Sequence, residues 1–276
     1  MPLSLTIRRL LSNQPVELPV FHPIAIRLQQ MLNSLDFTMD EVVKLVNEDP
    51  SLAGHILRMA NSTVYMGRVR VETIKDAVVR MGALQVANIT MAASQAGLHA
   101  SDNELINRYL QSLWLHSHAC AVGCRWLAKA AGYPHLADQV YLAGLLHDVG
   151  KLYLLKALER LNNAGVAQTS LEEEFLLDIF TELHVEQGCR IMEYWNLPQT
   201  YIDAVAFHHA DTYDTSNRVV TIVRLVNSAC TSKGISLMPD PSLDVLTLPE
   251  ASLLELTAEE IAELGDILDE TQDLSA

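Results

Sequence analysis

Apolar positions recur every three to four residues along most of the chain, which is the period of an amphipathic helix. The first apolar stripe is spaced by four, three, one and three residues: Ile24, Leu28, Met31, Leu32 and Leu35. The same period predicts helices over five longer stretches: Ile74–Gln95, Ile106–Ala131, Leu136–Leu158, Leu171–Trp195 and Thr200–His209. Val69–Thr73 alternates briefly, but it is too short to indicate a sheet. The pattern predicts an all-α fold, a multi-helix bundle with an N-terminal helical lobe.

Capping signals mark the starts of further helices. Thr38-Met-Asp-Glu41 is a capping box, and the helix it opens has four residues expected to face inward: Val42, Val43, Leu45 and Val46. Pro50 fits the first turn of a helix that runs towards Asn61. A second capping box, Thr257-Ala-Glu-Glu260, precedes an apolar side: Ile261, Leu264, Ile267 and Leu268. We expect this last helix to dock on the chain's own core, because its apolar side needs burial.

Changes in composition divide the chain into three segments. Polar or proline-containing stretches near Leu98–Asn103 and Ser232–Leu248 predict an N-terminal helical lobe at 1–100, a central helical lobe at 101–233 and an extension at 234–276. The formal net charge is −15, and the extension holds eleven acidic residues and neither lysine nor arginine. Acidity at this level argues against direct binding of nucleic acid or an anionic membrane. We expect the N-terminal basic residues to form a solvated surface: Arg58, Arg68, Arg70, Lys75 and Arg80.

The sequence predicts a cytoplasmic protein. Arg8 and Arg9 lie where a signal peptide would need its apolar core. The longest uncharged stretch, Met81–Ser101, is too polar to span a membrane. The four cysteines form no CxxC pair, and we expect them to be small core residues. Cys120 and Cys124 share a helix face, which leaves metal ligation as the alternative.

Histidines gather in the central lobe, where seven of the ten lie between His116 and His209. In the run LLHDVGKL, His147 and Asp148 interrupt an otherwise apolar helix. Burying an imidazole beside a carboxylate costs several kcal/mol unless each finds a partner. That partner is a divalent metal, a polar network or a water-filled cleft. We expect Gly150 to break the helix, so that both adjacent residues reach one ion.

Other predicted helices bring histidine to the same lobe. His116 precedes His147 and Asp148 in the chain, and His184 and Glu186 follow them. His208 and His209 end a further helix, in which His209 shares the face of Ile202 and Val205. A shift of one residue in register would exchange the two, so which of them faces the site stays open. The candidate metal ligands are therefore His116, His147, Asp148, His184, His208 and His209. Imidazole with carboxylate suits Mn²⁺, Fe, Ni²⁺ or Zn²⁺ better than Ca²⁺ or Mg²⁺. The alternative, separate hydrogen-bonded core histidines, stays open at this point.

His116 followed by His147-Asp148 resembles the HD domain, whose members include metal-dependent phosphohydrolases. Further motifs in the same order resemble the HDOD family: Leu18-Pro19, Asp49-Pro-Ser-Leu52, Ile56-Leu-Arg-Met-Ala-Asn-Ser62, Ile74-Lys-Asp-Ala-Val-Val-Arg-Met-Gly82, Trp195-Asn-Leu-Pro198 and Ala204-Val-Ala-Phe-His-His209. The resemblance implies an all-α, HD-like bundle with two lobes, bacterial and cytoplasmic, that acts in signalling through protein partners. It also implies a domain without the hydrolase activity of its HD relatives.

This chain nevertheless keeps the histidines and the aspartate of the HD pattern. The resemblance therefore carries a second function, a metal-dependent phosphohydrolase that acts on a phosphorylated or nucleotide-like substrate, with Asp148 and Lys151 as catalytic residues. The HD pattern ends with a further aspartate ligand, where this chain has Asn227, a weaker neutral ligand. The stretch Asp211–Ser216 lacks the glycine-tyrosine-proline of cyclic-dinucleotide phosphodiesterases. We therefore favour the signalling domain, with a cleft that still binds metal.

Overall fold

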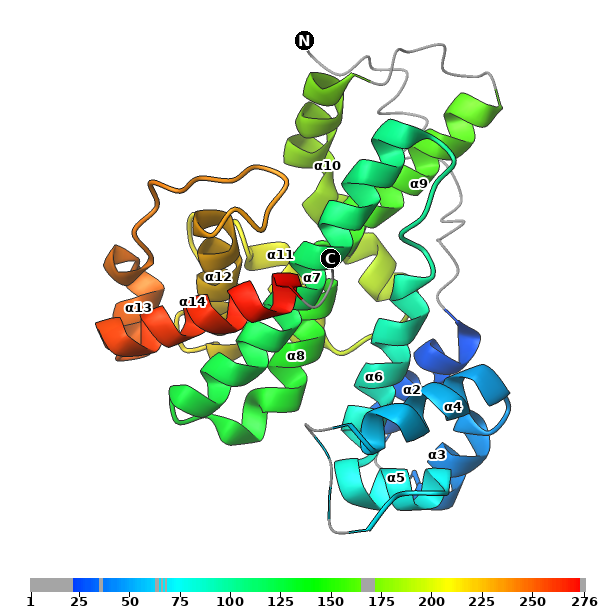
Figure 1. Ribbon diagram of the computed structural model, residues 1–276. Helices are drawn as coiled ribbons and strands as arrows, with labels where there is room; N and C mark the ends of the chain where they lie inside the picture. Colours follow the sequence, from blue (N-terminus) through cyan, green and yellow to red (C-terminus); the bar gives the residue numbers. More distant parts are fainter. Residues whose placement is uncertain are drawn as a thin grey trace. The chain divides into compact units, whose positions relative to one another are not determined.

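The computed structural model describes residues 22–34, 37–62, 65, 67, 69–164 and 172–273. Every regular element within these residues is helical, which confirms the predicted all-α fold. The described residues form two compact units, one within Val20–Leu98 and Trp195–Leu197, the other within His99–Tyr194 and Pro198–Ala276 (Figure 1). We call them the α2–α6 unit and the α7–α14 unit.

The α2–α6 unit contains five helices: α2 (Pro23–Asn33), α3 (Met39–Val46), α4 (Pro50–Ala60), α5 (Ile74–Met81) and α6 (Ala83–Ala96). The predicted capping box at the start of α3 is confirmed, since the Thr38 side chain accepts from the Glu41 amide and Glu41 accepts from the Thr38 amide. Leu28 and Val42 are among its fully buried core residues. Leu35, Arg68 and the Leu18-Pro19 motif lie outside the described residues.

A segment distant in sequence completes this unit. Trp195 and Leu197 are 3% and 5% exposed, and both belong to the α2–α6 unit although they follow α10 in the chain. The Gln30 side chain donates a hydrogen bond of 2.8 Å to the carbonyl oxygen of Trp195. The unit is therefore not one continuous stretch of sequence.

The single helix expected over Ile74–Gln95 is wrong, because the chain turns at Gly82 between α5 and α6. Gly82 has a φ of 86° and caps the C-terminal end of α5. This φ is accessible to glycine but strained for other residues. Hydrophobic periodicity continues across the turn and so does not reveal it.

The α7–α14 unit is built around the long helix α7 (Glu104–Ala130), which packs against α8, α12 and α14. The other helices of the unit follow in order: α8 (Ala137–Leu146), α9 (Val149–Asn163), α10 (Glu173–Tyr194), α11 (Gln199–Phe207), α12 (Arg218–Ser232), α13 (Pro249–Leu253) and α14 (Ala258–Asp273). Two short 3₁₀ turns, Pro134–Leu136 and Val245–Thr247, lie between them.

The C-terminal helix α14 lies against α7, as its apolar side predicted (Figure 1). Its capping box forms, with Thr257 and Glu260 exchanging hydrogen bonds between side chain and backbone. Leu264 and Leu268 are fully buried. A Cβ atom at Gly123 of α7 would lie 3.0 Å from a Leu268 methyl carbon, so the glycine allows this close packing. Residues 234–273 thus belong to the same unit as the histidine-bearing helices.

Within the described residues, none of the helices is long and apolar enough to cross a membrane. The cysteines are all free, and Cys120, Cys124 and Cys230 are buried as expected, while Cys189 is partly exposed.

Candidate metal centre

His147 and Asp148 lie at a break in the chain between α8 and α9. The helix expected over Leu136–Leu158 is interrupted, as predicted, but the predicted position of the break is wrong, because Gly150 lies inside α9. Asp148 has φ −103° and ψ 16°, which is outside the helical range. At this break the two side chains come together, with His147 Nε2 3.5 Å from Asp148 Oδ2.

Gly150 has a different role, which is to allow α9 and α10 to cross closely. A Cβ atom at Gly150 would lie 1.8 Å from the carbonyl oxygen of His184. Gly188, one turn further along α10, would place a Cβ 2.7 Å from Val205 of α11. Because these two glycines have no side chain, α9, α10 and α11 approach closely, and His184 lies near His147 and Asp148.

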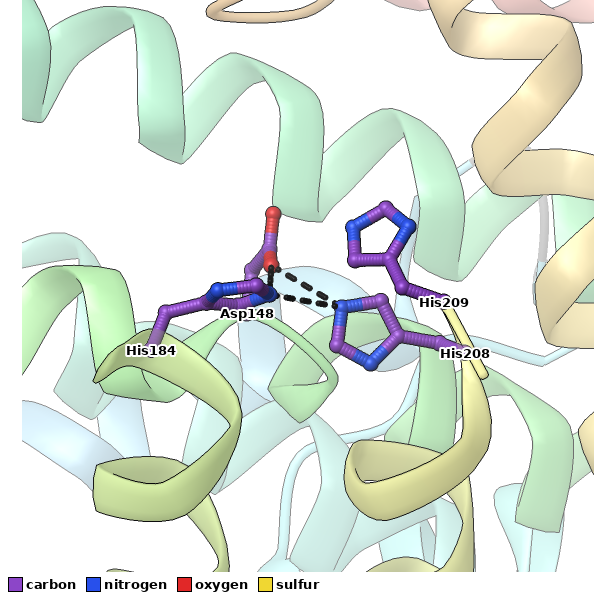
Figure 2. Close-up of side chains that lie close together, drawn as sticks. All are labelled: Asp148, His184, His208 and His209. Atoms are coloured by element: carbon purple, nitrogen blue, oxygen red, sulfur yellow. Dashed lines mark hydrogen bonds and ion pairs between the residues drawn. The ribbon is translucent and has the colours of Figure 1, made fainter. Parts of the chain in front are cut away.

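The Asp148 carboxylate is the centre of the cluster. Its Oδ2 atom lies 3.4 Å from His116 Nε2 and 2.7 Å from the Lys151 ammonium. Its Oδ1 atom lies 3.3 Å from His208 Nε2 and 3.8 Å from His184 Nε2 (Figure 2). Each oxygen thus faces a different set of imidazoles, and all of these residues are buried.

The four buried imidazoles share one orientation. The Nδ1 atom of each ring lies within hydrogen-bond distance of a backbone carbonyl: Ile235 for His116, Gly144 for His147, Phe180 for His184 and Val205 for His208. A carbonyl oxygen only accepts, so each Nδ1 carries a proton and donates it. In the neutral ring Nε2 then presents a lone pair to the cluster. Metal-bound histidines are held in this way.

The Nε2 atoms face one another in two pairs across the cluster. His116 Nε2 lies 3.2 Å from His147 Nε2, and His184 Nε2 lies 3.2 Å from His208 Nε2. Asp148 Oδ1 is buried and accepts no hydrogen bond. Two neutral acceptors at this separation repel unless a proton or a cation lies between them. These side chains therefore fit a bound divalent cation, and the cluster has the composition of a metal site.

Electrostatics favour ligand-competent forms for three of the residues. Burial alone would raise the pKa of Asp148, but the Lys151 ammonium and the neighbouring imidazoles hold that pKa well below its usual value. Burial lowers the pKa of His147 well below its usual value and lowers the pKa of His184 to about 4. Asp148 is therefore a carboxylate and both of these imidazoles are neutral at pH 7.

His116 differs from the other imidazoles. Burial opposes its protonation, but hydrogen bonds with Asp148 and Cys230 outweigh burial and raise the pKa of His116 to about 9. In the metal-free cluster His116 is thus protonated at pH 7, and a metal at this ring displaces that proton.

His208 and His209 separate at the end of α11. His208 is 3% exposed and points to Asp148. His209 is exposed, and Figure 2 draws no dashed line from it to Asp148. The sequence leaves open which of the two faces the cluster, and the structure turns His208 inward, because α11 ends at Phe207 and the helical register does not continue. A His209 ring nitrogen still lies within 4.8 Å of ligand atoms from Asp148, His184 and His208.

The structure adds Cys120 to the cluster. Its sulfur lies within 4.8 Å of one nitrogen each of His116 and His147. Cys120 and Cys124 are both buried, as expected, but of the two only Cys120 joins this group. The better signal was the spacing of four residues between His116 and Cys120, which places both on one face of α7. Asn227 is buried on α12, and its role as a ligand stays a prediction.

Fold and cluster together define a helical domain of the HD type with a candidate metal centre. The family model of the HDOD domain matches residues 18–211, so the chain belongs to the HDOD family. A curated relative, an uncharacterized protein of Treponema pallidum (strain Nichols), is 26% identical over 199 residues, which are 70% of this chain and 38% of the relative. The chain spans about two fifths of the length of that relative.

Solved structures share the fold. An HDOD domain protein of unknown function from Geobacter sulfurreducens has a TM-score of 0.74 at 22% identity, covering 97% of this chain and 95% of its own. A candidate metal-dependent phosphohydrolase of Shewanella amazonensis SB2B has a TM-score of 0.69 at 18% identity and covers 96% of each chain. A candidate signal transduction protein of Marinobacter aquaeolei VT8 has a TM-score of 0.68 at 22% identity, covering 98% of this chain and 64% of its own.

Proposed function

We propose that the chain is a bacterial, cytoplasmic HDOD signalling domain whose α7–α14 unit binds a divalent metal and whose output runs through a protein partner. One observation supports the proposed metal centre above all others. Four buried imidazoles donate through Nδ1 to the backbone and turn their Nε2 atoms towards one carboxylate. No part of the proposal requires direct contact with nucleic acid or a membrane.

The ligands fall into two sets that share Asp148. His116 and His147 lie on the side of Oδ2, and His184 and His208 lie on the side of Oδ1, with His209 next to them. Nitrogen and carboxylate donors suit Mn²⁺, Fe, Ni²⁺ or Zn²⁺. The chain thus offers donors for up to two ions, with Asp148 between them.

Burial supports a regulatory role for the centre. His147 and Asp148 are 0% and 1% exposed, so an ion held between them is enclosed by protein. Such an ion binds the folded state and stabilises it by mass action. Its presence or absence would change the rigidity of the helices that carry the ligands. A partner that recognises those helices would then sense the metal.

A second candidate function is a metal-dependent phosphohydrolase. His209 is exposed and its ring centroid lies 5.3 Å from that of His184, so one side of the cluster reaches solvent. A bound divalent metal would polarise a phosphoryl group and lower the pKa of a coordinated water. Lys151, now paired with Asp148 at 2.7 Å, would place its charge against a phosphorylated or nucleotide-like substrate.

Elemental analysis of the full chain, purified without chelator, tests the metal centre. We expect at least one equivalent of a transition metal, lost in His147→Ala and in Asp148→Ala. A pure sample without metal, in which both variants keep wild-type stability, contradicts the proposal. A phosphatase screen with added Mn²⁺ or Ni²⁺ then separates the two functions, because a regulatory domain binds the ion without turnover.

A further inference from the structure

Cys120 lies at the His116 end of the cluster. Its sulfur is 3.7 Å from His116 Nε2 and 3.6 Å from the sulfur of Cys230, which belongs to α12. Cys120 and Cys230 are both fully buried. Cys120 follows His116 by one turn of α7, so a fixed helix face presents both donors to the same point.

The separations from His116 Nε2 to its neighbouring donor atoms fit a tetrahedral ion. Bond lengths of about 2.0 Å to nitrogen and about 2.3 Å to sulfur place neighbouring ligand atoms roughly 3.3 to 3.8 Å apart. The observed separations are 3.2 Å between the Nε2 atoms of His116 and His147 and 3.7 Å between His116 Nε2 and Cys120 Sγ. Asp148 Oδ2 lies 3.4 Å from His116 Nε2 and 3.5 Å from His147 Nε2, so a carboxylate oxygen lies beside the same two nitrogens.

Charge gives a second reason to look for a thiolate here. The two imidazoles of His116 and His147 are neutral when they bind an ion, and Asp148 supplies one negative charge, which it shares with the second set of ligands. This single charge does not balance the two positive charges of a buried divalent cation. Helix α12, which packs against α7, has no aspartate or glutamate and carries the neutral Asn227. A thiolate at Cys120, on α7, would supply a further negative charge to the same ion.

We propose that Cys120 is a thiolate ligand of the ion held by His116 and His147, and that this site therefore selects Zn²⁺ or Co²⁺ over Mg²⁺ and Mn²⁺. The inference rests on the proposed metal centre and deepens it by naming the class of ion. Thiolate donors are soft and favour Zn²⁺, whereas carboxylate and water suit Mg²⁺ and Mn²⁺. On coordination the thiol proton leaves to bulk solvent and a sulfur–metal bond forms.

Cobalt loading tests this proposal directly. Chelator-treated full-length protein receives Co²⁺, elemental analysis counts the bound ion, and absorption spectroscopy detects the sulfur-to-cobalt charge-transfer band in the near ultraviolet. We expect the band in the wild type, its loss in Cys120→Ala and its retention in Cys124→Ala. Cys124 is the matched control, since it is equally buried one turn further along α7. The Zn²⁺ dissociation constant should rise at least about tenfold in Cys120→Ala alone.

The outcomes separate the two proposals. Bound Co²⁺ without the band overturns the thiolate ligand and leaves the metal centre standing. A band that survives in Cys120→Ala but disappears in Cys230→Ala assigns the sulfur to Cys230 and also overturns the proposal. If no Co²⁺ binds to the wild type, the metal centre itself fails. Should Cys120→Ala not fold, X-ray absorption of the zinc-loaded wild type decides, because a sulfur scatterer at about 2.3 Å is either present or absent.

Discussion

The Nε2 atoms of His184 and His208 lie 3.2 Å apart, although each ring already directs its Nδ1 proton to a backbone carbonyl. Such a pair has no hydrogen to share when both rings are neutral, so the contact is unfavourable until a cation accepts both lone pairs. The backbone carbonyls thus hold the rings ready for an ion. The arrangement is typical of metal ligands and not of isolated core histidines.

We expect His208→Ala to weaken binding of a divalent metal at least about tenfold, because it removes one lone pair of this pair. Isothermal titration of the chelator-treated chain measures the affinity. His118→Ala is the matched control, since His118 stacks on Trp114 at a centroid distance of 5.5 Å and lies outside the cluster. Equal affinities in the two variants would show that the cluster is not the binding site.

Lys151→Met should destabilise the metal-free chain by about 3 kcal/mol, because it leaves the buried Asp148 carboxylate without its ammonium partner. Added metal should recover most of that loss, since the cation then neutralises the same carboxylate. Chemical denaturation with and without metal gives both values. Lys233→Met serves as the control: Lys233 pairs with Asp269 at the surface, where both side chains are more than a third exposed, and its loss should cost less than about 1 kcal/mol. An equal cost in both metal states would contradict the prediction.

Gly150→Ala should lower stability by about 3 kcal/mol or more and abolish metal binding. The new methyl group would collide with the His184 carbonyl, which lies 1.8 Å from its position, and α9 and α10 would have to separate. Thermal unfolding and metal titration measure the two effects. Gly54→Ala, also within a helix, meets only the Arg58 side chain at 3.7 Å and should raise stability by about 0.5 to 1 kcal/mol. Full metal affinity in Gly150→Ala would refute the close crossing.

Leu268→Ala should reduce the free energy of unfolding by about 2 to 5 kcal/mol, because Leu268 is fully buried where α14 packs on α7. Denaturant titration measures this loss. Glu263→Ala, an exposed position of the same helix, should change stability by less than about 0.5 kcal/mol. Similar small effects from both variants would mean that α14 is not part of the folded core in solution.

Helix positions could be predicted well from the sequence where apolar spacing and capping residues agreed. The boxes at Thr38 and Thr257 marked helix starts that the structure confirms. Breaks inside apolar runs could not be predicted in this way. Gly82 changes the chain direction through its φ, and the break at Asp148 depends on contacts made by residues distant in sequence. Gly82 leaves the hydrophobic pattern unchanged, and the polar pair His147-Asp148 interrupts that pattern without showing that a helix ends there.

The candidate site could also be predicted only in part from the sequence. Residue types and helical spacing pointed to the histidines and Asp148, and the structure brings them together. The choice between His208 and His209 depends on where α11 ends, and periodicity does not fix an end to within one residue. Cys120 and Cys124 are both core residues, as the sequence predicts, but the sequence does not distinguish them, because only the folded chain brings Cys120 near Cys230 and His147.

The hydrogen bond between Gln30 and the carbonyl of Trp195 has a consequence for synthesis of the chain. A ribosome releases α2 to α6 first, but the segment that completes their unit emerges only after the histidine-bearing helices α7 to α10. The first helices therefore wait, incompletely covered, through about a hundred further codons, a delay of roughly 5 to 20 s at ordinary elongation rates. A gene fragment ending at residue 100 would encode a unit that lacks its last piece.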